Sequence, residues 1–280
     1  MIAFDDVAAD YDRREADNPI MQLMRARSLE MLEHTFSHNA TLLDVGCGTG
    51  TEAMWLAQRG REVFAVDSSS RMLEVLSRRL AAADLRISTR LLRAGDLMKL
   101  VDELGEGSFD GAYSSFGALN TEPSLEGPVA ALSRLVRPGG RIVLSVMNRW
   151  CLAEMALLAA GGRGKQPFRR IRPTVRVAVG SSIAEVRYPS WREMRNALHP
   201  RFRIVTVHAL PLFLLPYAWP AFSGRPRLFK VVSRLDHALA PRRPFAWLGD
   251  HLLVVAERTQ GVRQEGRPIQ LASRAATPLP

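Results

Sequence analysis

Cysteine and lysine are scarce in this chain of 280 residues. The two cysteines, Cys47 and Cys151, are too few for a disulfide framework, which favours a reducing compartment. Residues 1–10 lack the basic-then-apolar order of a signal peptide. The apolar stretch over residues 211–222 is interrupted by prolines and therefore does not predict a transmembrane helix. We expect a cytoplasmic protein without a transmembrane segment.

The net charge of +10 is concentrated in one part of the chain. Residues 163–230 carry 14 basic and two acidic residues, a net charge of +12, while the remainder carries −2. This excess can be a solvated face, or it can serve an acidic substrate, a nucleic acid or an anionic membrane surface. No nucleic-acid recognition module is evident, and aromatic residues do not interleave with the basic ones in a known pattern. We therefore expect no nucleic-acid partner. Peripheral membrane contact stays open, and the sequence indicates no oligomeric state.

One stretch, residues 41–51 with the sequence TLLDVGCGTGT, organises the chain. An apolar run is followed by glycines at alternate positions and then by a helical pattern, which predicts a buried strand, a tight loop and a helix. Glycine tolerates unusual backbone angles and lets a ligand approach the bare backbone. A dinucleotide fingerprint needs G-x-G-x-x-G, but Thr51 stands where the third small residue belongs. The spacing therefore weakens the case for a nicotinamide dinucleotide.

The motif D-x-G-x-G-x-G, from Asp44 to Gly50, resembles the glycine motif of class I S-adenosylmethionine-dependent methyltransferases. The run L-x-R-L-x-R-P-G-G-R, from Leu132 to Arg141, resembles the turn before the fifth strand in the same family. The resemblance covers residues 1–148 by motif and 200–258 by strand pattern, and it implies S-adenosylmethionine as the cofactor. The residues that it implies for cofactor binding are Asp44, Gly46, Cys47, Gly48, Gly50, Asp67, Ser68, Met72, Gly95, Asp96, Leu97, Ser114 and Ser115.

Particular roles are expected for a few of these residues. Asp67 ends the second apolar run, where a carboxylate can accept hydrogen bonds from both ribose hydroxyls of an adenosine. The resemblance implies that Met72 packs on the adenine, unless it is ordinary helix core, and that Asp96 holds the adenine amino group. Cys47 is expected to fill space, because no histidine completes a nucleophile pattern with it. We expect no metal, since His34 and His38 lack a third ligand.

Apolar strands alternate with amphipathic helices, which predicts a doubly wound α/β fold with helices on both faces of a mostly parallel sheet. With the resemblance, we expect a Rossmann-like sheet of seven strands, the last one antiparallel, over residues 41–45, 62–67, 87–96, 109–116, 141–146, 202–210 and 251–257. Residues 1–260 are expected to form a single domain, with an N-terminal lid and helix (1–40), a cofactor-binding core (41–148), an inserted cap with a hairpin (149–190) and the rest of the sheet (191–260). Residues 261–280 are expected to form a disordered tail.

The residues expected to bind the substrate are Tyr11, Phe116, Asn120, Asn148 and Tyr188. Tyr11 can instead pack on the first helix, and Asn120 can cap the helix that follows it. A hydroxyl acceptor would benefit from a base, for which the candidates are His199 and His251, with His208 as a third. Each of these histidines can instead be structural.

We expect transfer of a methyl group to an oxygen or nitrogen nucleophile of a small-molecule acceptor, such as a natural-product or secondary-metabolite intermediate. The reaction would be an in-line displacement that relies on proximity and the exclusion of water. A hydrophobic acceptor pocket is favoured by the apolar helix expected over residues 150–160 and by Phe213, Tyr217, Trp219 and Phe222, although these residues can simply cover the sheet. The alternatives are a nucleic-acid methyltransferase that uses the basic part, and a non-catalytic scaffold, against which the intact motifs argue.

Overall fold

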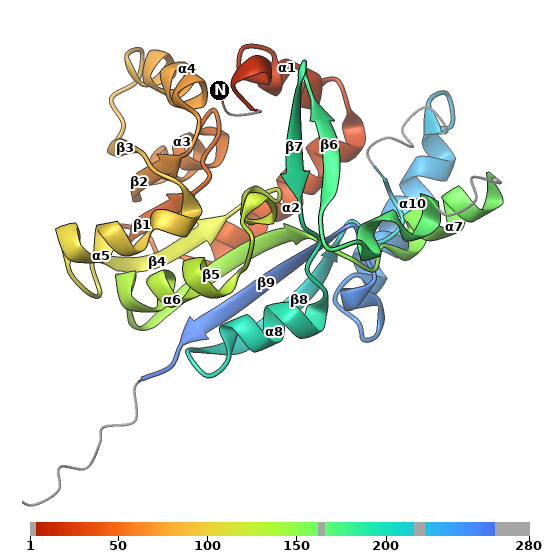
Figure 1. Cartoon of the computed structure of the whole chain (residues 1–280). Helices are drawn as coiled ribbons and strands as arrows, with labels where there is room; N and C mark the ends of the chain where they lie inside the picture. Colours follow the sequence, from red (N-terminus) through yellow and green to blue (C-terminus); the bar gives the residue numbers. More distant parts are fainter. Residues whose placement is uncertain (1–3, 162–165, 216–221, 261–280) are drawn as a thin grey trace, which may run out of the picture.

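A seven-stranded sheet forms the centre of the computed structural model, which describes residues 4–161, 166–215 and 222–260 (Figure 1). The strand order is β3-β2-β1-β4-β5-β9-β8, and only β9 runs antiparallel to its neighbours. The predicted doubly wound, mostly parallel sheet with an antiparallel last strand is confirmed. The strands are β1 (Thr41–Val45), β2 (Glu62–Asp67), β3 (Ile87–Leu91), β4 (Phe109–Ser114), β5 (Val136–Met147), β8 (Phe202–Leu210) and β9 (His251–Arg258).

Helices cover both faces of the sheet. Neighbouring residues Leu42 and Leu43 of β1 belong to two different apolar cores, because successive side chains of a strand point to opposite faces. The core around Leu42 includes side chains of α2 (Pro19–Thr35), α3 (Thr51–Ala57), α4 (Ser70–Leu80) and α10 (Pro226–Leu239). The core around Leu43 includes side chains of α5 (Met98–Leu104), α6 (Glu126–Leu135) and α8 (Trp191–Leu198).

Two helices begin where their sequence signals predict. The side chain of Asn18 accepts the backbone N–H of Ile20 at 3.0 Å, and Pro19 takes the first helical position of α2. Ser190 and Glu193 form a reciprocal capping box at the start of α8. Local side-chain chemistry therefore fixes both starting points.

Three strands differ in length from the sequence prediction. β3 ends at Leu91 and a short 3-10 helix, η2 (Ala94–Asp96), follows, because its neighbour β2 ends at Asp67 and offers no further partner. β4 ends at Ser114, and Phe116 has a left-handed φ of 51° that no strand accepts. β5 begins five residues early, at Val136, and includes the predicted turn, with a register shift opposite Phe109 and Gly111.

The insertion after β5 contains the predicted hairpin, which forms a separate two-stranded sheet of β6 (Val175–Val179) and β7 (Ser182–Val186). It follows α7 (Leu152–Ala160) and the 3-10 helix η4 (Gln166–Ile171). Figure 1 shows the hairpin standing away from the sheet, beside the N-terminal elements η1 (Asp5–Val7) and α1 (Tyr11–Ala16). The carboxylate of Asp6 accepts hydrogen bonds from Ser181 and Ser182 at the hairpin turn. We call the hairpin and residues 4–17 together the roof.

None of the described helices combines the length and the apolar character required to cross a membrane. Residues 261–280, for which a tail was expected, lie outside the described part of the chain. Two shorter 3-10 helices, η3 (Ala118–Thr121) and η6 (Phe245–Trp247), complete the description.

We expect the substitution Gly111→Ala in β4 to destabilise the fold. A Cβ atom there would lie 2.4 Å from Cε1 of Phe36 and 2.7 Å from the carbonyl oxygen of Arg141. Phe36, at the end of α2, and Arg141, in β5, would therefore have to move away from β4. Overpacking of this kind costs about 1–3 kcal/mol. Gly127→Ala in α6 is the matched control, because nothing lies within 4 Å of its Cβ position. Urea unfolding should show a loss for Gly111→Ala and no loss for the control, and equal midpoints would contradict the packing argument.

Candidate functional site

A cavity of about 320 Å³ lies at the carboxyl ends of β1, β2 and β4, beneath the roof. Ligands of open α/β sheets bind at this edge. Of the residues predicted for the site, the cavity is lined by Tyr11, Asp44, Gly46, Cys47, Gly48, Asp67, Ser68, Met72, Ser115, Phe116 and Tyr188. The structure thus brings together residues from positions 11 to 188 of the sequence.

The three glycines of the loop after β1 all have left-handed φ angles, and each has its own reason. A Cβ at Gly46 would lie 2.2 Å from Cβ of Ala118, while the backbone N–H of Gly46 bonds the carbonyl of Val66 at 2.8 Å. A Cβ at Gly48 would meet nothing within 4 Å, and this glycine borders the cavity. Gly50 does not line the cavity; it begins α3 and lies against Leu76. Its role is to shape the loop.

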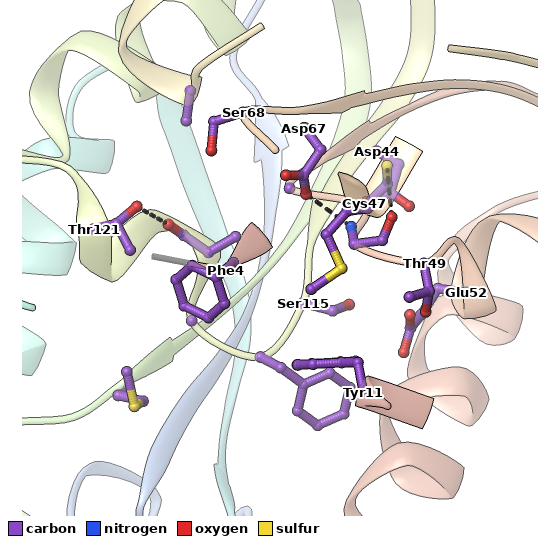
Figure 2. A pocket seen from close by; sticks show the side chains of 18 of the residues that line it. Phe4, Tyr11, Asp44, Cys47, Thr49, Glu52, Asp67, Ser68, Ser115 and Thr121 are labelled. Atoms are coloured by element: carbon purple, nitrogen blue, oxygen red, sulfur yellow. Dashed lines mark hydrogen bonds between the residues drawn. The ribbon is translucent and has the colours of Figure 1, made fainter. Parts of the chain in front are cut away.

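Asp67 fastens this loop to the end of β2. Its carboxylate accepts the backbone N–H of Gly48 at 2.8 Å and that of Ser69 at 2.8 Å. Burial raises the pKa of Asp67, although both N–H groups act in the opposite direction. The carboxylate also borders the cavity, as Figure 2 shows. Asp67 is therefore held in one orientation with its acceptor oxygens beside the open space.

A second carboxylate, that of Asp44, is buried in the cavity wall. Its Oδ2 atom has no hydrogen-bond partner among the described residues. Burial, together with the negative charge of Glu52, raises the pKa of Asp44 well above its usual value. Glu52 is itself paired with Arg25 of α2, and both line the cavity. This wall can bind a cationic group.

The other side of the cavity is mainly apolar. The roof contributes Phe4 and Tyr11 from the N-terminal segment, which lie across from Asp67 and Asp44 in Figure 2. Phe116 is held between the guanidinium of Arg25, 5.0 Å from its ring centroid, and the ring of His251, at 6.2 Å between centroids. The remaining apolar side chains on this side are Met147, Val177, Val179, Val186 and Tyr188.

Several cavity residues were missed by the sequence prediction. Arg25 and Glu52 lie on helices, and the apolar periodicity of a helix predicts only which side faces the core. The sequence around them therefore does not indicate that they face a cavity. Thr49 is inside the glycine motif, and its hydroxyl donates to Asp12 at 2.6 Å. Glu122, a buried residue of the loop before α6, borders the cavity, and its carboxylate lies beside Gly95, next to Asp96 in the sequence.

Five residues predicted for the cofactor lie off the cavity wall, namely Gly50, described above, and four others. Asp96 is paired with Lys99 at 3.1 Å, and 42% of its side chain is exposed. Leu97 is fully buried in the core. Gly95 turns within η2 with a Cβ position 2.7 Å from Glu122, and the Ser114 hydroxyl donates to the carbonyl of Val45 at 2.8 Å. In this structure Gly95, Leu97 and Ser114 therefore take part in packing or backbone bonding, whereas Asp96 forms a partly exposed ion pair.

The two asparagines predicted to bind substrate are structural. The side chain of Asn120 bonds the backbone of Met147 through both of its polar atoms, at 2.8 and 2.9 Å, and donates to the carbonyl of Arg187. It fastens the end of the hairpin to the end of β5. The Asn148 amide donates to the carbonyls of Trp150, Trp247 and Gly249, which join the ends of β5 and η6.

The histidines predicted as bases lie in different places, and the fold contradicts only the prediction for His199. His199 is exposed and precedes β8, whose first residue pairs with Arg258, so it lies at the opposite edge of the sheet. His251 lies at the correct edge but is buried behind Phe116, with Nδ1 2.9 Å from Oδ2 of Asp250. His208 is bonded to Thr206 at 2.9 Å and does not line the cavity. Tyr217 and Trp219 lie outside the described residues.

A buried charge cluster supports the insertion. Cys151, Glu154 and Asp250 lie close enough to share an ion, but the guanidinium of Arg170 bonds both carboxylates. This neighbour keeps the pKa of Asp250 well below its usual range despite its burial. Burial raises the pKa of the Cys151 thiol to about 12, and that of the Cys47 thiol is also raised by burial. This environment therefore disfavours the thiolate form of both cysteines.

Comparisons with known proteins agree with this geometry. Residues 42–140 match the family described as "Methyltransferase domain". The chain is 36% identical over 143 residues to demethylmenaquinone methyltransferase of Clavibacter sepedonicus, covering 50% of this chain and 55% of the relative. It is 33% identical over 108 residues to a ubiquinone biosynthesis O-methyltransferase of Alkalilimnicola ehrlichii, covering 39% and 42%. The matches thus span about half the length of these relatives. An S-adenosylmethionine dependent methyltransferase from Mesorhizobium loti shares the fold, with a TM-score of 0.53, 22% identity, and 82% and 96% of the two chains covered.

We expect Asp44→Asn to stabilise the ligand-free protein at neutral pH. Because the pKa of Asp44 is raised in the folded state, its ionisation opposes folding, and this cost appears as the pH rises above the ordinary carboxylate range. Removing the charge should raise the free energy of unfolding by on the order of 1–2 kcal/mol at pH ~8, with little change at pH ~4.

Asp110→Asn is the control of opposite sign. Burial alone would raise the pKa of Asp110, but the N–H of Thr41 and the guanidinium of Arg137 lower it below its usual value. This variant should have a lower free energy of unfolding than the parent at neutral pH, and the same value as the parent in acid. Urea unfolding of both variants at the two pH values gives the measurement, and destabilisation by Asp44→Asn at pH ~8 would contradict the assignment of a charge cost to Asp44.

Proposed function

We propose that this chain, which belongs to the class I S-adenosylmethionine-dependent methyltransferases, transfers a methyl group from S-adenosylmethionine to an oxygen or nitrogen atom of a small-molecule acceptor. The observation that carries the proposal is the meeting of the glycine loop, Asp67 and Asp44 on one cavity beneath the roof. Residues 1–260 would act as one domain, since β8 and β9 complete the sheet that β1 begins.

The cavity provides complementary groups for each part of the cofactor. Asp67 has fixed acceptor oxygens for the ribose hydroxyls, and the exposed backbone of Gly48 leaves room beside them. Met72, Leu92 and Ala94 offer apolar surface for the adenine. The unpartnered Oδ2 of Asp44 suits the ammonium group of the methionine part. When bound, the cofactor supplies a methyl group on a sulfonium, which is already strongly electrophilic.

The protein then has to hold the acceptor in line and exclude water. Ordering two reactants in this way removes much of the entropic barrier without a covalent intermediate. The roof closes the cavity from above, and Phe116 borders the place where both ligands meet. For a hydroxyl acceptor, His251 remains the candidate base: Oδ2 of Asp250 lies 2.9 Å from its Nδ1 atom, and Nε2 would take the proton. Because Phe116 stands between His251 and the cavity, a shift of that ring would have to accompany proton transfer.

The acceptor side favours an apolar compound. Phe4, Val177, Val179 and Val186 carry no charge, and Tyr188 adds an aromatic surface. A natural-product or secondary-metabolite intermediate with a hydrophobic body fits this lining. The reaction would take place in the cytoplasm, in agreement with two buried, free cysteines.

A nucleic-acid acceptor fits the cavity less well. The roof offers no described cation at the acceptor side, whereas a phosphate backbone needs several. A non-catalytic scaffold would not need the left-handed glycines or the buried, costly Asp44. Both alternatives are therefore less consistent with the site than methyl transfer to a small molecule.

We expect calorimetry to detect binding of S-adenosylmethionine and its demethylated product, and Asp67→Ala to weaken it by about 1.5–3 kcal/mol, since hydrogen bonds to a charged group contribute that much. Asp96→Ala is the matched control: it also removes an aspartate near the predicted adenine site, but one that lies off the cavity and pairs with Lys99. The control should bind like the parent. Absence of heat with either ligand, or a larger loss for Asp96→Ala than for Asp67→Ala, would refute the proposed site.

We expect a thermal-shift screen with the demethylated cofactor present to select apolar, amphipathic compounds. Val177→Asp places a charge on the cavity side of the hairpin and should abolish this stabilisation, while Ile183→Asp on the exposed side of the same hairpin should not. Selection of only small polar amines or acids would contradict the apolar acceptor. Tight tRNA binding with a steep dependence on salt would favour the nucleic-acid alternative.

A further inference from the structure

Helix α10 has two apolar faces, of which only one is used by the fold. On the inner face, Phe229 and Val232 pack against the core around Leu42. Asp236 is fully buried there, pairs with Arg27 of α2, and accepts backbone N–H groups of Leu212 and Phe213 at 2.9 and 2.7 Å. The helix is therefore fixed firmly to α2, and its orientation is well defined.

The outer face carries Leu228, Val231 and Leu235, which are 44%, 53% and 51% exposed. Their spacing places all three on one side of an α-helix. Single exposed apolar residues are ordinary, but three along one face form a continuous stripe. Figure 1 shows α10 at the periphery of the molecule. We call these three residues the outer stripe.

Cations border the outer stripe. Arg227, Lys230 and Arg234 are exposed on the same helix, on the side of the stripe away from the core. The only acid of α10, Asp236, is buried and paired, so it does not offset them. The outside of α10 therefore combines apolar and purely cationic side chains.

We propose that α10 lies on the surface of an anionic lipid bilayer, with the outer stripe among the acyl chains and the three cations at the headgroups. Helices with an apolar side and a basic side bind in this way, and both the buried area and the attraction to anionic lipid contribute. Pairing with a second copy through this face is disfavoured, because a symmetric interface would bring the same cations together. A nucleic acid would satisfy the cations but leave the outer stripe in water.

This orientation also relates the bilayer to the cavity. Arg27, which fixes α10, lies two residues from Arg25 on α2, and Arg25 lines the cavity. Helix α2 would therefore connect the bilayer-bound α10 directly to the wall of the cavity. The docking itself is independent of the proposed methyl transfer, so its test requires no substrate.

The experiment is flotation of the full chain with vesicles of phosphatidylglycerol and phosphatidylcholine, compared with vesicles of phosphatidylcholine alone. We expect binding to the mixed vesicles that falls as salt is added. The triple variant Leu228→Ser, Val231→Ser, Leu235→Ser should lose at least about tenfold in affinity. The triple variant Arg227→Gln, Lys230→Gln, Arg234→Gln should lose about 100-fold on the mixed vesicles.

Two matched controls keep this test specific. Leu91→Ser, Leu104→Ser, Val205→Ser removes three apolar side chains of similar exposure elsewhere, and Arg192→Gln, Arg195→Gln, Arg201→Gln removes three exposed cations near α8. Both should bind vesicles like the parent. Equal loss in a control and in the corresponding α10 variant would overturn the proposal, as would no flotation of the parent. Sedimentation of the parent should show no dimer that depends on the outer stripe. A dimer of the parent that the triple serine variant dissociates would identify the outer stripe as a subunit interface instead.

Discussion

The carboxylate of Asp67 is the contact on which the site depends. It joins the end of β2 to the backbone of Gly48, a residue of the glycine loop that borders the cavity. The loop in turn requires left-handed backbone at Gly46, where Ala118 leaves no room for a side chain. One side chain and one backbone conformation thus hold β1, β2 and the loop after β4 in register around the cavity. A ligand that bonds Asp67 therefore enters a site whose parts are already in position before it binds.

The parts of the site that could be predicted from the sequence are those with a local cause. The glycine motif and Asp67 are fixed by strand ends and loop geometry, which a pattern of apolar residues reveals. His199 lies away from the cavity because it precedes β8, and the first residue of β8, Phe202, pairs with Arg258 at the opposite edge of the sheet. Asp96 lies off the cavity wall in this structure because β3 ends at Leu91, opposite the last residue of β2, and the following residues turn into η2, where Asp96 pairs with Lys99.

The asparagines illustrate a different limit. Asn120 in η3 and Asn148 directly after β5 were predicted to bind substrate, yet in this structure their amide NH2 groups donate to backbone carbonyls. A polar residue next to a cavity can serve a ligand or the loops around it, and the sequence contains no signal that distinguishes the two uses. The same holds for Arg25 and Glu52, which reach the cavity only because α2 and α3 pack on the same face of the sheet.

The roof and the buried carboxylate together relate binding to stability. The two parts of the roof are joined by hydrogen bonds that the exposed serines of the hairpin turn donate to Asp6, and such surface bonds cost little to break. The cavity beneath keeps Asp44 buried without a partner for one of its oxygens, which is costly while the cavity holds only water. A cationic ligand that pairs with Asp44 removes this cost. Because the ligand binds only the folded state, it should stabilise the protein by more than its other contacts in the cavity would provide. The weak bonds of the roof then allow the ligand to enter, while the unpaired charge of Asp44 favours its retention. Entry thus depends on the peripheral elements of the roof, and retention depends on the central sheet.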